Sequence, residues 1–369
     1  MNVLYVYADG EHEMNCSKWN CLIPAKYINK LEGHTANTIH INDWVKNDEN
    51  SQKLSSEADI IVVERNYFGD TLTIINFWKV RGKTVIGIFD DAYHIMHPMN
   101  PSYRFWNYGE LKGRDKEGNE RTVNMKPVPI EQFKWGLKML KGIQVPSVNL
   151  AKDWLTHTDT YFVHNFLDWD KYENIEPMYP HNDDEIIIGW HGSLSHYSSF
   201  VESGVLDALR KIGKKYPQVK VLLGGDKRNF DNLEVKNKVF QPYVPEDKFT
   251  SLIKSFDIGL APLSGEYDKR RSWIKVLEYM ALQVPWVATD YITYDELKPY
   301  GIVTENGYTN WVGALSNAIE NITELKEKAK GAPYEFAKSQ SSEIGVRKVT
   351  IPLYQQLIDE PNYPNILRE

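Results

Sequence analysis

The chain has 369 residues, of which 42% are hydrophobic and 25% charged, and its formal net charge is −7 at pH 7. This length is too great for a single hydrophobic core and fits two domains of about 150–200 residues each. The composition is that of a globular protein and argues against a disordered chain. The acidic balance argues against a protein whose whole surface binds nucleic acid, and no apolar run approaches the roughly 18 residues of a membrane span.

The beginning of the chain, MNVLYVYADGEHE, has neither a basic leader nor a long apolar stretch, which predicts an unprocessed, cytoplasmic protein. Cys16 and Cys21 are the only cysteines, and their spacing indicates neither a disulfide framework nor a structural zinc site. Strands and helices then alternate. Strands are expected at 3–7, 38–41, 59–64 and 84–89, with helices at 19–31 and 71–81. This alternation predicts an α/β fold with a parallel sheet and function at the carboxyl ends of its strands.

Polar residues follow several of these strands. Arg65, Asp90, Asp91 and His94 all occupy predicted strand ends, so their side chains are expected to meet at one edge of the sheet. The alternative is structural: either aspartate could cap the next helix, and His94 or His97 could pack against it.

Residues 110–145 differ in composition from the segments before them. They contain eight Lys or Arg against five Asp or Glu, a local charge of +3 on an acidic protein. We expect a surface loop followed by an amphipathic helix at 130–142. Its cations could attract an anionic acceptor, a membrane surface or a DNA backbone, although a solvated helix face is the commoner explanation.

The second half of the chain predicts another α/β domain after a polar linker at 176–184, with a long helix expected at 311–330. The Gly192-Ser193 turn follows a predicted strand, and glycine there lets backbone N–H groups approach a diphosphate. Lys227 and Arg228 follow the next strand, where GDKRN also fits an ordinary turn. No G-x-G-x-x-G is present, which argues against an NAD-type site.

The most informative stretch is 257–290. It predicts a strand, a cationic loop, a helix at 272–282 and a second strand. Arg271, Ser272 and Lys275 could lie together at the N-terminus of this helix and bind a phosphate, while Glu278 lies one turn further along the same side of the helix. A carboxylate at that depth could accept hydrogen bonds from a ribose diol, so the set describes a nucleotide site. The alternative is a βαβ unit with an ordinary charged loop.

Within this stretch, SxxKxLEYMAxxxPxVA resembles the donor-site segment of the retaining glycosyltransferases of family 4. The resemblance implies a GT-B fold, that is, two Rossmann-like doubly wound α/β domains facing across a cleft. We expect an amino-terminal domain at 1–180, a donor domain at 181–345, and a terminal helix and tail at 346–369 that cross back. Many members carry an acid eight residues before the position of Glu278, where this chain has Arg270. The sequence therefore looks more like the branch with a basic-Ser-x-x-Lys-x-x-Glu motif.

The resemblance also implies roles for individual residues. The donor-binding residues would be Gly192, Ser193, Lys227, Arg228, Tyr243, Ser272, Lys275 and Glu278, and the catalytic candidates are Asp91, His94, Arg271 and Lys275. The donor would be a nucleotide sugar, with a UDP- or GDP-sugar expected, and no further cofactor or metal would be needed. In the front-face mechanism implied by this family, the leaving phosphate takes the acceptor proton.

Other functions stay open. The acceptor is expected to be a glycan or a lipid-linked glycan reached by peripheral membrane contact, and the alternative is a modified base in DNA. A sugar-nucleotide epimerase or a non-catalytic nucleotide-sugar-binding subunit would use the same fold. Asp168 and Asp170 form a DxD that could hold a divalent cation, but their place before a linker favours an interdomain loop.

Overall fold

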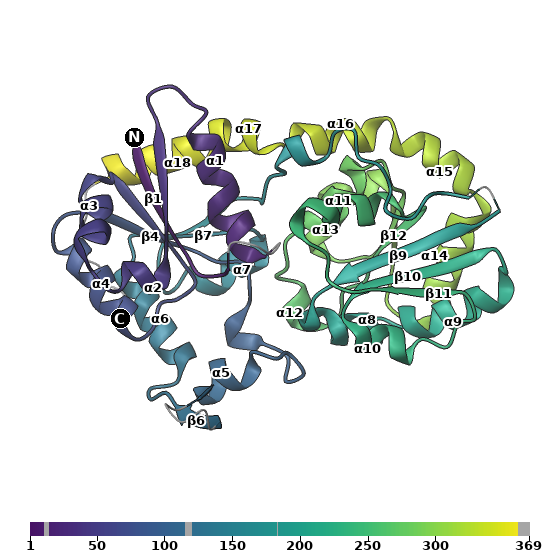
Figure 1. The fold of residues 1–369 in the computed structure, drawn as a ribbon, viewed down its shortest axis with the longest axis horizontal. Coiled ribbons are helices and arrows are strands. Elements are labelled where there is room, and N and C mark those ends of the chain that lie inside the picture. Colours follow the sequence, from purple (N-terminus) through teal and green to yellow (C-terminus); the bar gives the residue numbers. More distant parts are fainter. Residues whose placement is uncertain (11–14, 115–119, 183, 361–369) are drawn as a thin grey trace.

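The computed structural model describes residues 1–10, 15–114, 120–182 and 184–360. Two six-stranded parallel sheets lie side by side, each with helices on both faces (Figure 1). The prediction of two α/β domains is therefore confirmed. The expected boundary at residue 180 lies in the connection between the last strand of the first sheet and the first strand of the second.

The first sheet has the order β2-β1-β3-β4-β7-β8. Its strands are β1 Asn2–Tyr7, β2 Thr35–His40, β3 Ile60–Glu64, β4 Thr84–Ile88, β7 Ile143–Val145 and β8 Thr160–Phe162. The helices of this domain are η1 Lys18–Leu22, α1 Ile23–Ile28, α2 Ile41–Trp44, α3 Glu49–Glu57, α4 Asp70–Lys79, η2 Tyr93–Ile95, α5 Tyr103–Tyr108, α6 Pro129–Met139 and α7 Val148–Trp154.

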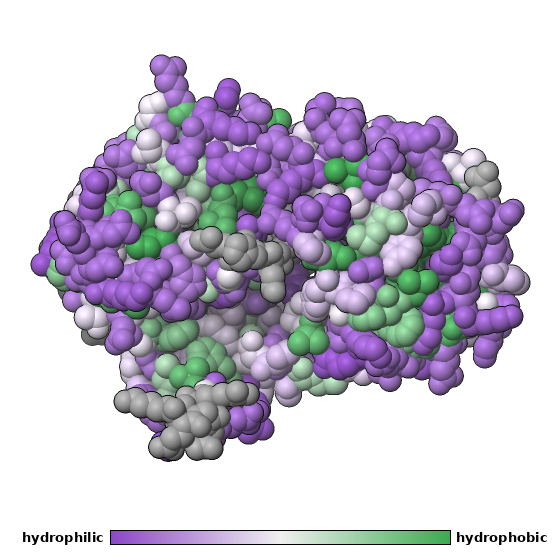
Figure 2. Space-filling model, viewed as in Figure 1, coloured by the Kyte–Doolittle hydropathy of each residue, from purple (hydrophilic) through white to green (hydrophobic). Residues whose placement is uncertain are grey.

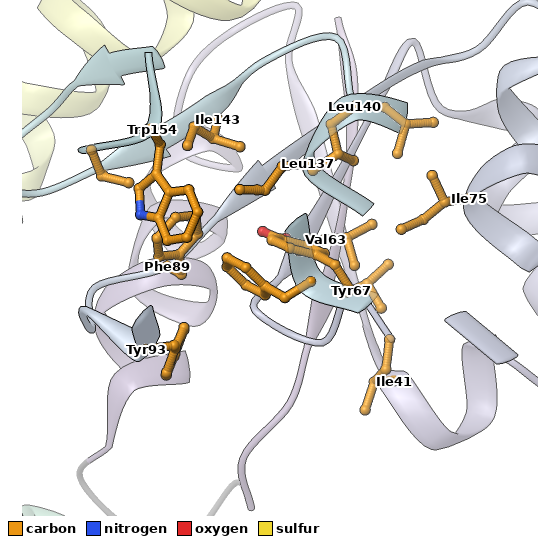
Figure 3. Packing of buried hydrophobic residues seen from close by; sticks show 14 of the residues in the cluster. Ile41, Val63, Tyr67, Ile75, Phe89, Tyr93, Leu137, Leu140, Ile143 and Trp154 are labelled. Carbon is orange, nitrogen blue, oxygen red and sulfur yellow. The ribbon is translucent and has the colours of Figure 1, made fainter. Parts of the chain in front are cut away.

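Both faces of this sheet are buried, as the apolar strand sequences predict. Along β3, Ile61 and Val63 join the core on one face, while Ile60 and Val62 join the core on the other. Successive side chains of a strand point to opposite faces, so a run of apolar residues supplies both cores. Figure 3 shows the first of these cores, in which the rings of Phe89 and Trp154 lie 6.2 Å apart.

The second sheet has the order β11-β10-β9-β12-β13-β14. Its strands are β9 Ile186–Gly192, β10 Val219–Gly225, β11 Lys238–Gln241, β12 Ile258–Ala261, β13 Trp286–Thr289 and β14 Ile302–Thr304. Its helices are η4 Leu194–His196, α8 Tyr197–Glu202, α9 Val205–Lys215, α10 Lys227–Asn232, α11 Glu246–Lys254, α12 Gly265–Asp268, α13 Ile274–Ala281, η5 Ile292–Tyr300, α14 Tyr308–Glu320, α15 Ile322–Ala329 and α16 Ala332–Ser339. The strand order reverses between β9 and β12, and ligands of such sheets bind at this switch point.

Three predicted elements differ from those in the structure. The loop expected after residue 110 forms an antiparallel ribbon, β5 Glu110–Arg114 with β6 Glu120–Asn124, which projects from the first domain with α5 (Figure 1). The helix expected at 272–282 begins at Ile274, and a short helix, α12, precedes it. The long helix expected at 311–330 is divided at Asn321, which separates α14 from α15.

The end of the chain returns to the first domain. α17 Ser342–Gly345, η6 Val346–Thr350 and α18 Ile351–Asp359 follow one another and lie on that domain in Figure 1. Tyr354 is fully buried there, and its hydroxyl lies 3.0 Å from the hydroxyl of Tyr5. The terminal helices therefore pack on the first domain, whereas residues 361–369 of the expected tail lie outside the described residues. Within the described residues, no helix is both long and apolar enough to cross a membrane.

Candidate active site

Two glycine-containing strand ends form one side of the candidate site. Gly192 ends β9 and Gly225 ends β10, and the N–H of Asp226 donates to the oxygen of Gly192 at 3.1 Å. Gly225 has φ +85°, and a Cβ on it would lie 2.4 Å from that oxygen. Only glycine fits this close approach. Tyr243 lies beside it with 56% of its surface exposed, so the structure brings two predicted donor residues, Gly192 and Tyr243, together.

The first turns of α13 carry two ionisable side chains of the site, Lys275 and Glu278. Lys275 donates from Nζ to the backbone oxygen of His191 at the end of β9. Glu278, only 4% exposed, accepts a hydrogen bond at 3.1 Å from the hydroxyl of Tyr172. Burial lowers the pKa of Lys275 to about 8, although Glu278 opposes this shift, and burial raises the pKa of Glu278 to about 7 against the effect of Lys275. The predicted ammonium and carboxylate therefore lie at the switch point of the sheet.

Arg271 occupies the loop just before α13. Its guanidinium donates to Asp268 at 3.0 Å and to the backbone oxygen of Ser195 at 3.2 Å, and it lies 3.7 Å from the carboxylate of Asp91. Burial alone would lower the pKa of Arg271, but Tyr267, Asp268 and Asp91 raise it by more than burial lowers it. The guanidinium therefore stays charged. This charge lies beside the loop that follows β9, where the phosphate site is predicted.

Ser272 lies next to this cation. Its hydroxyl accepts a hydrogen bond from the N–H of Ile274 at 3.3 Å, which satisfies one free donor at the start of α13. Ser193, also predicted at the site, is exposed, and its hydroxyl lies 2.8 Å from that of Ser195. Hydroxyl groups from two loops therefore flank Arg271.

The first domain contributes Asp91 and His94, which were predicted at strand ends. The hydroxyl of Tyr267 donates to Asp91 at 2.6 Å, and Nε2 of His94 lies 3.1 Å from Asp153. Asp91 therefore bonds the second domain, whereas His94 is engaged by α7 of its own domain. Next to Asp91, burial raises the pKa of Asp90 to about 7, and the neighbouring carboxylate adds to this shift.

Lys227 and Arg228 are engaged locally. Lys227 pairs with Asp231 one turn along α10, and its side chain is 62% exposed. Arg228 donates to Asp226 and, at 2.9 Å, to the backbone oxygen of Leu194. Only Arg228 of the two therefore bonds the loop that follows β9.

The aspartates of the DxD are also used by the protein. Asp168 is 2% exposed and accepts from Lys26 at 2.6 Å and from the hydroxyl of Tyr27 at 2.8 Å. Asp170 pairs with Lys26 and Lys30. These bonds tie the connection between the domains to α1. Among the residues that the structure describes, no group of three or more His, Cys, Asp or Glu could hold a metal ion.

Several contacts at the site were not predicted. Tyr172, Asp153 and Tyr267 have no motif around them, and Tyr172 reaches Glu278 across 106 positions of sequence. A tyrosine in a linker carries no signal of this kind, because its partner is fixed only by the tertiary fold.

A cavity of about 200 Å³ lies between the two domains next to Arg271. The residues that line it are Pro146, Ser147, Val148, Asn149, Phe162, His164, Lys269, Arg271, Trp273, Ile292, Thr293, Asp295 and Glu296. Figure 2 also shows the molecule hollowed between its two domains. Space for a ligand is therefore present where the ends of the two sheets face each other.

Two facing Rossmann-like domains with this strand order and a crossing terminal helix define the GT-B fold. Solved structures share it at low identity. WaaG, a glycosyltransferase involved in lipopolysaccharide biosynthesis, matches with a TM-score of 0.64 and 12% identity over 98% of this chain and 100% of its own. A glycosyltransferase from Rickettsia africae ESF-5 matches with a TM-score of 0.62 and 14% identity over 98% and 99%. Anabaena Alr3699/HepE, in complex with UDP and glucose, matches with a TM-score of 0.61 and 14% identity over 96% and 100%.

The sequence of the second domain adds a family match. Residues 185–324 match the model of the family described as glycosyl transferases group 1. The matched segment contains β9 to α14 and so includes Arg271, Lys275 and Glu278. The second domain is therefore similar in sequence to the glycosyl transferases of group 1. No curated protein matches the sequence.

Proposed function

We propose that the protein transfers a sugar from a nucleotide-diphosphate sugar to an acceptor hydroxyl with retention of the anomeric configuration. The observation that carries the proposal is the arrangement of Arg271, Lys275 and Glu278 around the start of α13. Two cations and the free N–H groups of a helix start suit a diphosphate, and a buried carboxylate held by Tyr172 suits a ribose diol.

The chemistry needs little more than charge stabilisation. The bond between the anomeric carbon and the phosphate oxygen breaks, and the leaving diphosphate gains negative charge that Arg271 and Lys275 neutralise. The acceptor oxygen bonds to the same carbon on the same face, and its proton passes to the leaving phosphate oxygen. No side chain is then required as the base. A divalent cation is not part of the proposal.

The transferred sugar would lie between the domains. Asp91 supports this placement, because its carboxylate lies 3.7 Å from Arg271 and its side chain is 27% exposed. We propose that Asp91 accepts a hydrogen bond from a sugar hydroxyl on the first-domain side. The acceptor is proposed to be a glycan or a lipid-linked glycan, and the protein is proposed to act in the cytoplasm. WaaG, which is involved in lipopolysaccharide biosynthesis, supports the acceptor class, and Anabaena Alr3699/HepE, solved in complex with UDP and glucose, supports the donor class. In both cases the support is likeness of fold alone.

The first test is calorimetric titration of the protein with UDP, GDP, ADP and their sugars, with and without Mg²⁺. We expect one nucleotide to bind in the micromolar range without metal, and the Glu278→Ala variant to lose this binding. Donor hydrolysis in the absence of acceptor then separates an enzyme from a binding subunit, and proton NMR of the released sugar reports the anomeric configuration. Failure of all three nucleotides to bind would reject the proposal.

A further inference from the structure

The loop before α13, residues 264–271, is fastened to the first domain. We call it the donor loop, because Arg271 ends it. Its hydrogen bonds with the first domain are Tyr267 to Asp91 at 2.6 Å, the backbone oxygen of Lys269 from Asn149 at 3.2 Å, the backbone oxygen of Arg270 from Ser147 at 2.8 Å, and the guanidinium of Arg270 to Asp153. Arg271 adds an ion pair with Asp91 at 3.7 Å. Three of these partners, Ser147, Asn149 and Asp153, lie at the start of α7 or within it.

Arg270 makes the most specific of these contacts. Its Nε and Nη2 donate to the two oxygens of Asp153 at 2.8 and 3.1 Å, a bidentate pair. Nη1 donates to the backbone oxygen and the carboxylate of Glu266 within the same loop. The side chains of Arg270 and Asp153 are only 17% and 15% exposed. Arg270 therefore faces the first domain with four hydrogen bonds made, and it is not available to contact a sugar.

Asp153 is itself held in place. Its Oδ2 atom lies 3.1 Å from Nε2 of His94, and the ring of His94 lies 4.6 Å from that of Trp154. Burial lowers the pKa of His94, although Asp153 opposes this shift. The imidazole therefore shares Oδ2 of Asp153 with Nε of Arg270 and helps to hold the carboxylate in place.

We propose that Asp153 is a positioning residue, which fixes the cation Arg271 at the phosphate site by holding Arg270 across the domain interface. This inference rests on the proposed function. Arg271 directly follows Arg270, and the N–H groups of both close the same turn onto the oxygens of Tyr267 and Asp268, each at 3.1 Å. A shift of Arg270 therefore shifts Arg271.

The position of residue 270 agrees with this role. An acid at 270 would leave the partly buried Asp153 without its cation and bring a second carboxylate near it, which is unfavourable. Arg270 and Asp153 therefore function as a matched pair. The nucleotide binds to the second domain, but its affinity depends on Asp153 of the first domain. Without the pair, the donor loop keeps only its other contacts with the first domain, and nucleotide binding must order it further, which weakens affinity.

The experiment compares Asp153→Asn, which is nearly isosteric, with the control Glu185→Gln. Glu185 pairs with Lys220 at similar burial, but both residues belong to the second domain. Two quantities are measured: the dissociation constant of whichever of UDP, GDP or ADP binds the wild type, and hydrogen exchange of residues 264–271 without ligand. We expect Asp153→Asn to weaken nucleotide binding about tenfold and to speed exchange in the donor loop, with less than a twofold change in affinity for Glu185→Gln. The exchanged pair Asp153→Arg with Arg270→Asp should restore affinity to within about threefold of wild type.

Unchanged affinity in Asp153→Asn would overturn the inference, even if exchange became faster, because the contact would then be structural only. An equal loss in Glu185→Gln would overturn it as well. If the wild type binds none of the nucleotides, the proposed function fails on its own. The exchange measurement still decides the contact in that case, since unchanged protection of the donor loop would show that Asp153 does not hold it.

Discussion

Replacement of Lys275 by methionine tests the central charge of the site. The ammonium of Lys275 is bonded to the oxygen of His191 and lies one turn from Glu278, and the side chain is partly buried. Methionine has a similar length and keeps most of the packing, so the change removes the charge rather than the volume. The Glu278 carboxyl already has a pKa raised to about 7, and without Lys275 it takes up a proton at neutral pH. No uncompensated charge is then left in the core.

The expected loss follows from the charge that develops on the leaving diphosphate. A preorganised donor in a site shielded from water is worth about 2.7–4 kcal/mol in the transition state. Because each 1.36 kcal/mol corresponds to a tenfold change in rate, kcat/KM should fall by about 100-fold to 1,000-fold. Arg271 remains in the variant and retains part of the nucleotide affinity, so kcat should fall more than KM rises.

The assay is donor turnover, followed as release of the nucleoside diphosphate. Lys254→Met is the matched control, because Lys254 is also partly buried and donates to a backbone oxygen, that of Leu282, beyond the other end of α13. The control should lose some thermal stability and keep kcat/KM within about threefold. A loss below tenfold in Lys275→Met, or equal losses in the two variants, would refute the assignment of Lys275 to the diphosphate.

Three further predictions concern the same site. Nucleotide affinity should be highest between about pH 7 and pH 8, because Lys275 loses its proton above about 8 and Glu278 gains one below about 7. Calorimetric titration over this pH range measures the profile. The Lys275→Arg variant should show no decrease in affinity on the alkaline side. Tyr172→Phe removes the bond to Glu278, so affinity should fall about fivefold, for about 1 kcal/mol, and the acid limb of the same profile should move to higher pH. Gly225→Ala combines a positive φ with a 2.4 Å contact and should lower the melting temperature and nucleotide affinity, whereas Gly113→Ala, with open space around it, should change neither.

The fold was predictable because its signals are local. Apolar runs such as 59–64 indicate strands buried on both faces, and their alternation with helices fixes a parallel sheet. Lys275 and Glu278 were predicted on one side of one helix because their spacing of three sets that geometry. The ribbon β5–β6 was not predicted, because its strands are short and almost wholly polar, and two paired strands need no apolar alternation when neither face is buried.

The partners of the site residues could not be predicted, for a reason that Asp91, His94 and Arg270 make clear. In a protein with two facing sheets, a polar residue at a strand end can face a ligand or the opposite domain, and the sequence pattern is the same in both cases. Asp91 meets Tyr267 of the second domain, and His94 meets Asp153, which in turn pairs with Arg270 of the second domain. Residues expected to contact substrate therefore take part, directly or through one neighbour, in the contact between the domains. These two roles are not independent. In the role proposed for Asp153, a side chain that holds the donor loop also determines where Arg271 lies, so the contact between the domains contributes to the affinity for the nucleotide.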